Sequence, residues 1–91
     1  MTKSFKSLTQ DARLDLLIAD AQIALTLLES AELTSDDAVR TCHIEEAQKA
    51  YLIIMLRLPN LSVDEVKLKP LCTHLRLLRD RLIRLAAISD R

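Results

Sequence analysis

The sequence predicts an all-α protein, an up-down-up antiparallel three-helix bundle, and three observations support this fold class. The 91 residues include no glycine and only two prolines, whereas leucine makes up about one residue in five. Aromatic residues, which favour sheets, are only 2% of the chain. A short pattern of leucine, Ser or Thr, any residue and Asp occurs three times, at 8–11, 33–36 and 61–64. This length predicts one domain over residues 9–91, preceded by a short flexible lead at 1–8.

Each copy of the repeated pattern has the composition of a helix start. The hydroxyl can accept a hydrogen bond from a first-turn N–H, and the Asp stands at the positive end of the helix dipole. We expect the preceding leucine to fold back onto the first turn as a hydrophobic staple, Leu33 on Ala38 and Leu61 on Val66. The three copies therefore predict three helix N-termini.

The first helix is expected over residues 10–31. Its apolar residues recur at three- and four-residue steps, which places them on one face. These core positions are Leu14, Leu17, Ala21, Ala24 and Leu28, widened by Ile18 and Leu25. A second apolar stripe of Leu16, Ile23 and Leu27 lies on another side of the same helix, outside the predicted core.

The second helix is expected over residues 35–58. Asp36 and Asp37 fall in its first turn and Arg57 near its last, as the helix dipole favours. Its core stripe is Ile44, Ala47, Tyr51, Ile54 and Leu58. The run from Tyr51 to Leu56 is apolar all round, which predicts a segment buried on several sides.

The third helix is expected over residues 63–88, where leucines alternate at three- and four-residue steps. They are Leu68, Leu71, Leu75, Leu78, Leu82 and Leu85. Glu65 follows Ser62 by three residues, which predicts a capping box. Pro70 removes a backbone hydrogen bond and disfavours helical angles at Lys69, so we expect the helix to be kinked or restarted at Pro70.

Charge is distributed unevenly, although the formal net charge is zero. Residues 1–46 hold nine carboxylates against four basic side chains, and residues 47–91 hold nine basic side chains against four carboxylates. We expect acidic and basic helices to face each other within the bundle or across a dimer. The alternative is a basic face that binds phosphates, formed by Lys67, Lys69, Arg76, Arg79, Arg81 and Arg84. Asp80 stands four residues from both Arg76 and Arg84 and is expected to neutralise this face in part.

Two cysteines and two histidines stand in close pairs, and Cys₂His₂ is a common set of zinc ligands. Residues one apart on a helix point about 100° apart and residues two apart about 200° apart, so neither Cys42 with His43 nor Cys72 with His74 converges on one ion. In a hairpin turning near Asn60 the cysteines are displaced by about 10 Å, too far for a disulfide. We therefore predict no metal, no cofactor and no catalytic residue. Both cysteines are expected at core margins, His43 at the core boundary and His74 toward solvent.

The apolar surplus outside the predicted core is the main indication of function. It predicts a non-enzymatic protein–protein interaction module, a homodimer or a partner of another helical protein, of otherwise unknown cellular role. The expected interface residues are Leu16, Ile23, Leu27, Leu52, Ile53, Leu56 and Ile83. A nucleic-acid-associated regulator is the alternative, and an apolar ligand pocket with His43 or Tyr51 as polar group is a third hypothesis.

No membrane partner is expected, because the longest apolar run, from Ala50 to Leu56, is too short to cross a bilayer. Polar and charged residues interrupt any apolar segment behind Lys3 and Lys6, so no signal peptide is predicted. The expected location is cytoplasmic, with reduced cysteines.

Overall fold

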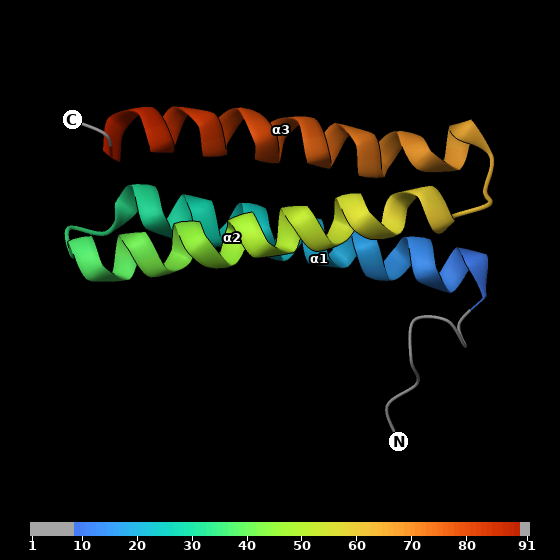
Figure 1. The fold of residues 1–91 in the computed structure, drawn as a ribbon, viewed down its shortest axis with the longest axis horizontal. Helices are drawn as coiled ribbons and strands as arrows, with labels where there is room; N and C mark the ends of the chain where they lie inside the picture. Colours follow the sequence, from blue (N-terminus) through green and yellow to red (C-terminus); the bar gives the residue numbers. More distant parts are fainter. Residues whose placement is uncertain (1–8, 90–91) are drawn as a thin grey trace, which may run out of the picture.

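The computed structural model describes the backbone of residues 9–89 and the side chains of residues 9–85. The predicted flexible lead at 1–8 lies outside the described residues. The elements are, in order, α1 (Gln10–Leu33), α2 (Asp37–Arg57), the short 3-10 helix η2 (Leu58–Asn60) and α3 (Glu65–Ser89). Consecutive helices run antiparallel (Figure 1), and the described part of the chain contains no strand. The predicted all-α three-helix bundle is confirmed.

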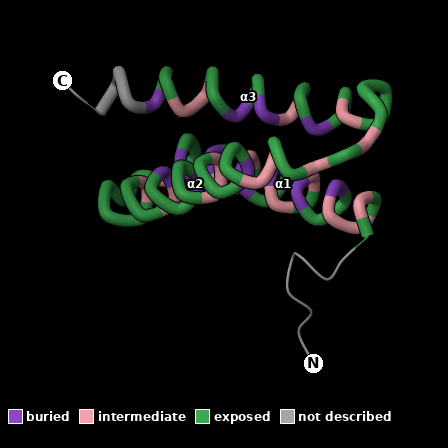
Figure 2. Tube along the Cα trace, turned by 45° about the vertical axis from the view of Figure 1, so that its right-hand side comes forward, coloured by how far each residue is buried: buried purple, intermediate pink, exposed green. Residues whose placement is uncertain are grey.

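The core consists of the stripes that the periodicity predicts. Of the predicted core positions on α1, the five central ones are buried, and Ile18 and Leu25 pack against them. Buried residues recur at intervals along each helix (Figure 2). They form two clusters, one around Leu28 and Leu78 and the other around Leu17 and Leu71. Helix α1 packs against both other helices, whereas α2 and α3 contact each other least.

The first two helix starts use different caps. At α1 the hydroxyl of Thr9 accepts a hydrogen bond from the N–H of Ala12 at 3.1 Å, as predicted. At α2 the cap is the Asp36 carboxylate, whose Oδ1 accepts from the N–H groups of residues 38 and 39 at 2.9 and 3.2 Å. Thr34 instead accepts from the Asp36 N–H at 3.2 Å. Since a carboxylate satisfies two N–H groups at the positive end of the dipole, α2 begins two residues later than predicted.

Neither predicted hydrophobic staple forms. Leu33 is 88% exposed and Val66 is 72% exposed, so neither makes the expected contact. Leu61 packs instead against the cluster around Leu17 and Leu71. Contact with the bundle core removes more of its apolar surface from water than a local contact would.

The start of α3 also differs from the prediction. The helix begins at Glu65, and the carbonyl of Asp64 accepts the first bonds, from Lys67 at 3.0 Å and Leu68 at 3.2 Å. The backbone N–H of Ser62 donates to the Gln10 side chain at 2.9 Å. The predicted capping box is therefore wrong for two reasons. The Ser62 N–H, which the Glu65 side chain would have bound in a capping box, is bound by Gln10 of α1 instead. Glu65 is also the first residue of the helix, not the third as a capping box requires.

Helix α3 continues through Pro70 without interruption (Figure 1). The prediction that the helix restarts at Pro70 is therefore wrong. The other predicted alternative, a helix kinked at Pro70, stays a prediction. The missing N–H leaves the Val66 carbonyl without its helical donor. Both residues are exposed, so water can satisfy this carbonyl at small cost.

Candidate interaction surfaces

The second half of α2 is the most exposed apolar segment of the described chain. Leu52 and Leu56 are 62% and 75% exposed, and Ile53 and Met55 between them are also exposed. Of residues 51–56 only Ile54 is fully buried, so the prediction of a segment buried on several sides is wrong. The reason is geometric: α1 and α3 cover one stripe of α2, and its outer sides have no neighbour among the described residues.

Six of the seven predicted interface residues are exposed, and Leu27 is half-buried. They do not form one surface. The structure places Ile23 and Ile53 on the α1–α2 side and Leu52 and Ile83 on the α2–α3 side. Leu56 is one helical turn from both Leu52 and Ile53, so it lies between the two sides on the outer surface of α2.

The first surface, here named the α1–α2 face, surrounds a shallow cavity of about 300 Å³. Its apolar lining is Ile23 of α1 with Ala50 and Ile53 of α2. Its charged lining is Asp20, Glu46 and Lys49. The α1–α2 face therefore combines exposed isoleucines with charges of both signs.

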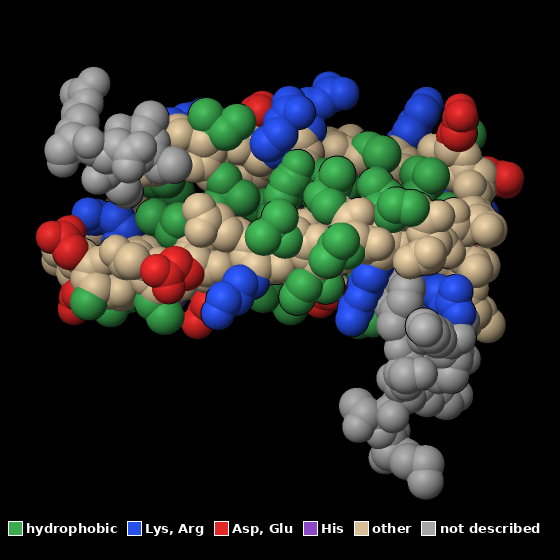
Figure 3. All heavy atoms as spheres, viewed as in Figure 1, with side chains coloured by type: hydrophobic (Ala, Val, Ile, Leu, Met, Phe, Trp, Pro, Cys, Tyr) green, Lys and Arg blue, Asp and Glu red, His purple; other side chains and the backbone are tan. Residues whose placement is uncertain are grey.

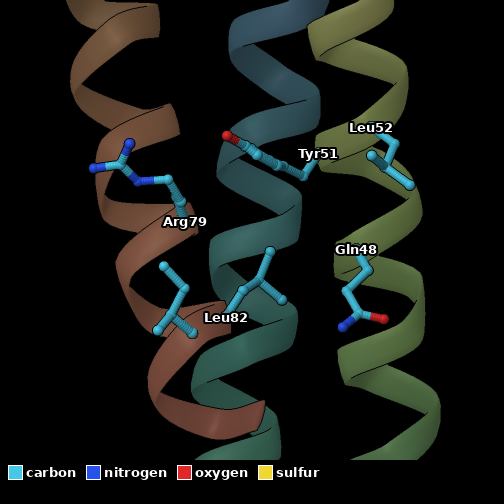
Figure 4. A pocket seen from close by; sticks show the side chains of 6 residues that line it. Gln48, Tyr51, Leu52, Arg79 and Leu82 are labelled. Carbon is cyan, nitrogen blue, oxygen red and sulfur yellow. The ribbon is translucent and has the colours of Figure 1, made fainter. Parts of the chain in front are cut away.

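The second surface, here named the α2–α3 groove, consists of two adjoining cavities of about 400 and 250 Å³. Both cavities are lined by Tyr51 of α2 and Arg79 of α3. In Figure 4 Tyr51 and Leu82 lie between the two helices with α1 behind them, whereas Arg79 lies over α3 with its guanidinium turned away from α2. Figure 3 shows hydrophobic side chains along the same face, between α3 above and α2 below. The groove is thus an apolar depression along the least contacted pair of helices.

The six basic side chains predicted to form one face of α3 do not act together in the structure, because they have different neighbours. Lys67 pairs with Asp11 at 3.3 Å and Arg81 with Glu29 at 3.4 Å, so both bind α1. These pairs join the acidic and basic halves of the chain within one bundle.

Two more of the six line the α2–α3 groove, Arg76 and Arg79. Arg79 lies 3.7 Å from Asp80, which takes the place of the expected pairs of Asp80 with Arg76 and Arg84. Among the described residues, Lys69, Arg76 and Arg84 are exposed and make no ion pair.

Both cysteines are free and exposed, so their predicted place at the core margin is wrong. Cys42 stands two residues before the buried Ile44, about 200° around the helix, and so points away from the core. Its Sγ donates to Glu46 Oε1 at 3.4 Å. This hydrogen bond, and the negative charge of the same carboxylate, raise the pKa of the Cys42 thiol above its usual value.

The histidines are both half-buried. His43 is partly buried, as predicted for a residue at the core boundary. Its Nδ1 atom is buried and has no hydrogen-bond partner among the described residues. His74 turns its Nδ1 to the Pro70 carbonyl of the preceding turn rather than fully to solvent, which corrects the prediction. Within residues 9–89, no three His, Cys, Asp or Glu side chains are grouped as metal ligands would be.

One residue has a structural role that was not predicted from the sequence. Arg40 of α2 donates from Nε to the Ala31 carbonyl at 3.2 Å and from Nη2 to the Thr34 carbonyl at 2.7 Å. It also pairs with Asp37 at 2.8 Å. Arg40 therefore caps the C-terminus of α1, a role that glycine performs in many proteins and that this glycine-free chain must fill otherwise.

Comparisons with profiles of known families, with curated proteins and with solved structures give no match for this chain. Among the described residues, no helix is both long and apolar enough to cross a membrane.

Proposed function

We propose that the chain is a non-enzymatic helical interaction module that forms a homodimer through the α1–α2 face. The observation that supports this most is the exposure of Ile23 and Ile53 beside each other, with the strongly exposed Leu56 one turn away. A contiguous apolar surface of this kind is typical of interaction sites. The two free, exposed cysteines are consistent with a reducing compartment, and a cytoplasmic location is part of the proposal.

The charges of the α1–α2 face suit contact with a second copy. A twofold dimer places the same surface on itself, so a self-binding face needs groups that complement one another. Asp20 and Glu46 lie beside Lys49 around the same cavity. In a twofold contact the lysine of one copy meets the carboxylates of the other, while the isoleucines are buried at the centre.

The test is absolute mass by size-exclusion chromatography with light scattering, over a roughly hundredfold range of concentration. The wild-type chain is expected at twice the 10.3 kDa of one chain. Ile23→Lys and, separately, Leu56→Glu place a charge in the contact and are expected to give the monomer mass, because burying an unpaired charge is strongly unfavourable.

Two matched variants serve as controls. Leu33→Lys and Val66→Glu make the same kinds of change at exposed positions that line neither surface. They are expected to keep the dimer mass, and circular dichroism should show folded helix in all four variants. A monomeric wild type, or a dimer that tolerates Ile23→Lys, contradicts the proposal.

Nucleic-acid binding stays the alternative proposal. The observation in its favour is that Lys69, Arg76 and Arg84 are exposed without ion pairs among the described residues. The engagement of Lys67 and Arg81 by α1 counts against it, because fewer cations remain available for phosphates.

A further inference from the structure

The α2–α3 groove has the length of a short helix. Its lining runs from Gln48 on α2 to Leu58 at the start of η2, and from Cys72 to Ile83 on α3. Ten residues of helix span about 15 Å, which corresponds to about three helical turns. Because α2 and α3 contact each other least and α1 lies behind them, a helix seated here would complete a four-helix arrangement.

The groove differs in charge from the other cavities described. Among the described residues, its charged lining consists of Arg76 and Arg79, and no carboxylate lines either of its two cavities. By contrast, the α1–α2 face is lined by Asp20 and Glu46, and the cavity between α1 and α3 by Asp11 and Asp15. Asp80 lies beside Arg79 at 3.7 Å, but both side chains are more than half exposed, so water weakens this pair.

We propose that the α2–α3 groove binds an amphipathic helix of a partner protein whose apolar stripe is flanked by carboxylates. The apolar stripe packs between Tyr51 and Leu52 on one wall and Leu82 and Ile83 on the other. The flanking carboxylates reach the guanidinium groups on the α3 side of the groove, where planar bidentate contacts are favourable. This inference rests on one part of the proposed function, namely that the chain is an interaction module; it does not depend on the proposed dimer.

A second copy of the chain does not fit the groove equally well. A twofold contact through this surface brings Arg76 and Arg79 of both copies into one interface whose lining supplies no carboxylate. Like charges brought together in this way oppose binding. The α1–α2 face, with charges of both signs, is the better surface for self-association.

The test uses two fluorescein-labelled helical peptides of about 14 residues. One carries leucines at i, i+3 and i+7 flanked by glutamates, and the other has lysine in place of each glutamate. Fluorescence anisotropy is measured on the full chain at low and physiological salt. The acidic peptide is expected to bind about tenfold more tightly than the basic one, with a preference that weakens as salt rises.

Variants locate the binding to the groove. Arg76→Glu combined with Arg79→Glu is expected to reverse the charge preference, and Ile83→Glu to abolish binding of both peptides. Arg84→Glu is the matched control, since Arg84 is an exposed arginine of the same helix that does not line the groove. Equal affinity for the two peptides, no binding of either, or no effect of the double reversal overturns the proposal.

The native cysteines give a second readout that needs no substitution. Cys72 lines the groove, whereas Cys42 is exposed on α2 and lines neither groove cavity. The acidic peptide is expected to slow alkylation of Cys72 and to leave that of Cys42 unchanged. Equal effects on the two thiols, or none, contradict binding in the groove.

Mass measurements separate this inference from the proposed dimer. Ile23→Lys is expected to lose the dimer and keep peptide binding, and the double reversal at Arg76 and Arg79 to keep the dimer. If the double reversal dissociates the dimer, the groove belongs to self-association and this inference is wrong. If Ile23→Lys keeps the dimer while the peptide results hold, the proposed dimer surface fails and the groove assignment stands.

Discussion

Replacing Arg40 tests how this chain ends α1. Thr34, which follows the helix, has extended backbone angles, and no described residue has a positive φ, so α1 lacks the left-handed cap that glycine usually supplies. Arg40 instead donates to the Ala31 and Thr34 carbonyls at 3.2 and 2.7 Å. Arg40→Met keeps the apolar stem of the side chain and removes the guanidinium.

The expected cost follows from these contacts. Hydrogen bonds that involve a charged group contribute about 1.5–3 kcal/mol when well protected. The Arg40 side chain is 35% exposed, so solvent weakens them, and we expect about 2 kcal/mol for the two bonds together. In a domain of this size such a loss lowers Tm by roughly 8–16 °C.

The assay is urea unfolding followed by circular dichroism at 222 nm, with the dimer equilibrium held fixed by constant protein concentration. Asp37→Asn isolates the exposed ion pair of Arg40, which should contribute at most about 1 kcal/mol. Arg84→Met is the control for removing an arginine without these bonds. The reasoning is refuted if Arg40→Met costs no more than Asp37→Asn or Arg84→Met.

Three further predictions concern the core, the exposed thiol and the alternative function. Leu78→Ala removes a fully buried side chain and should cost about 3–5 kcal/mol in urea unfolding, with a smaller loss contradicting close packing around it. Glu46→Gln removes the negative charge that raises the pKa of Cys42, so the rate of Cys42 alkylation, measured against pH, should rise at lower pH than in the wild type. An unchanged pH dependence would exclude the Glu46 charge as the cause of the raised pKa. If α3 binds nucleic acid, affinity for duplex or single strands must rise as salt falls and drop with Arg84→Glu, whereas no binding at low salt removes this alternative.

The sequence predicted the helices and their buried sides because both depend on local periodicity. The stripe from Leu14 to Leu28 is buried as expected. Of the predicted α3 leucines, four are buried and two, Leu68 and Leu82, are partly buried against the core. The caps were predicted less well, since Thr34 and Asp36 offer competing acceptors two residues apart and only their geometry decides between them.

The exposed surfaces required tertiary information. Periodicity shows that Tyr51 to Leu56 are apolar, but not that α3 stands away from α2 and leaves the outer sides of this segment uncovered. For the same reason the predicted interface residues could not be sorted into two surfaces. The role of Arg40 depends on contacts with the end of another helix, which no local pattern contains.

The central place of α1 has a consequence for how the bundle opens. Because α2 and α3 pack against α1 more than against each other, we expect α3 to detach as one cooperative unit while the α1–α2 hairpin stays paired. The ion pairs of Lys67 and Arg81 join α3 to α1, and salt weakens both because their side chains are at least partly exposed. Amide hydrogen exchange in α3 should therefore be faster than in α1, and the difference should grow as the ionic strength rises.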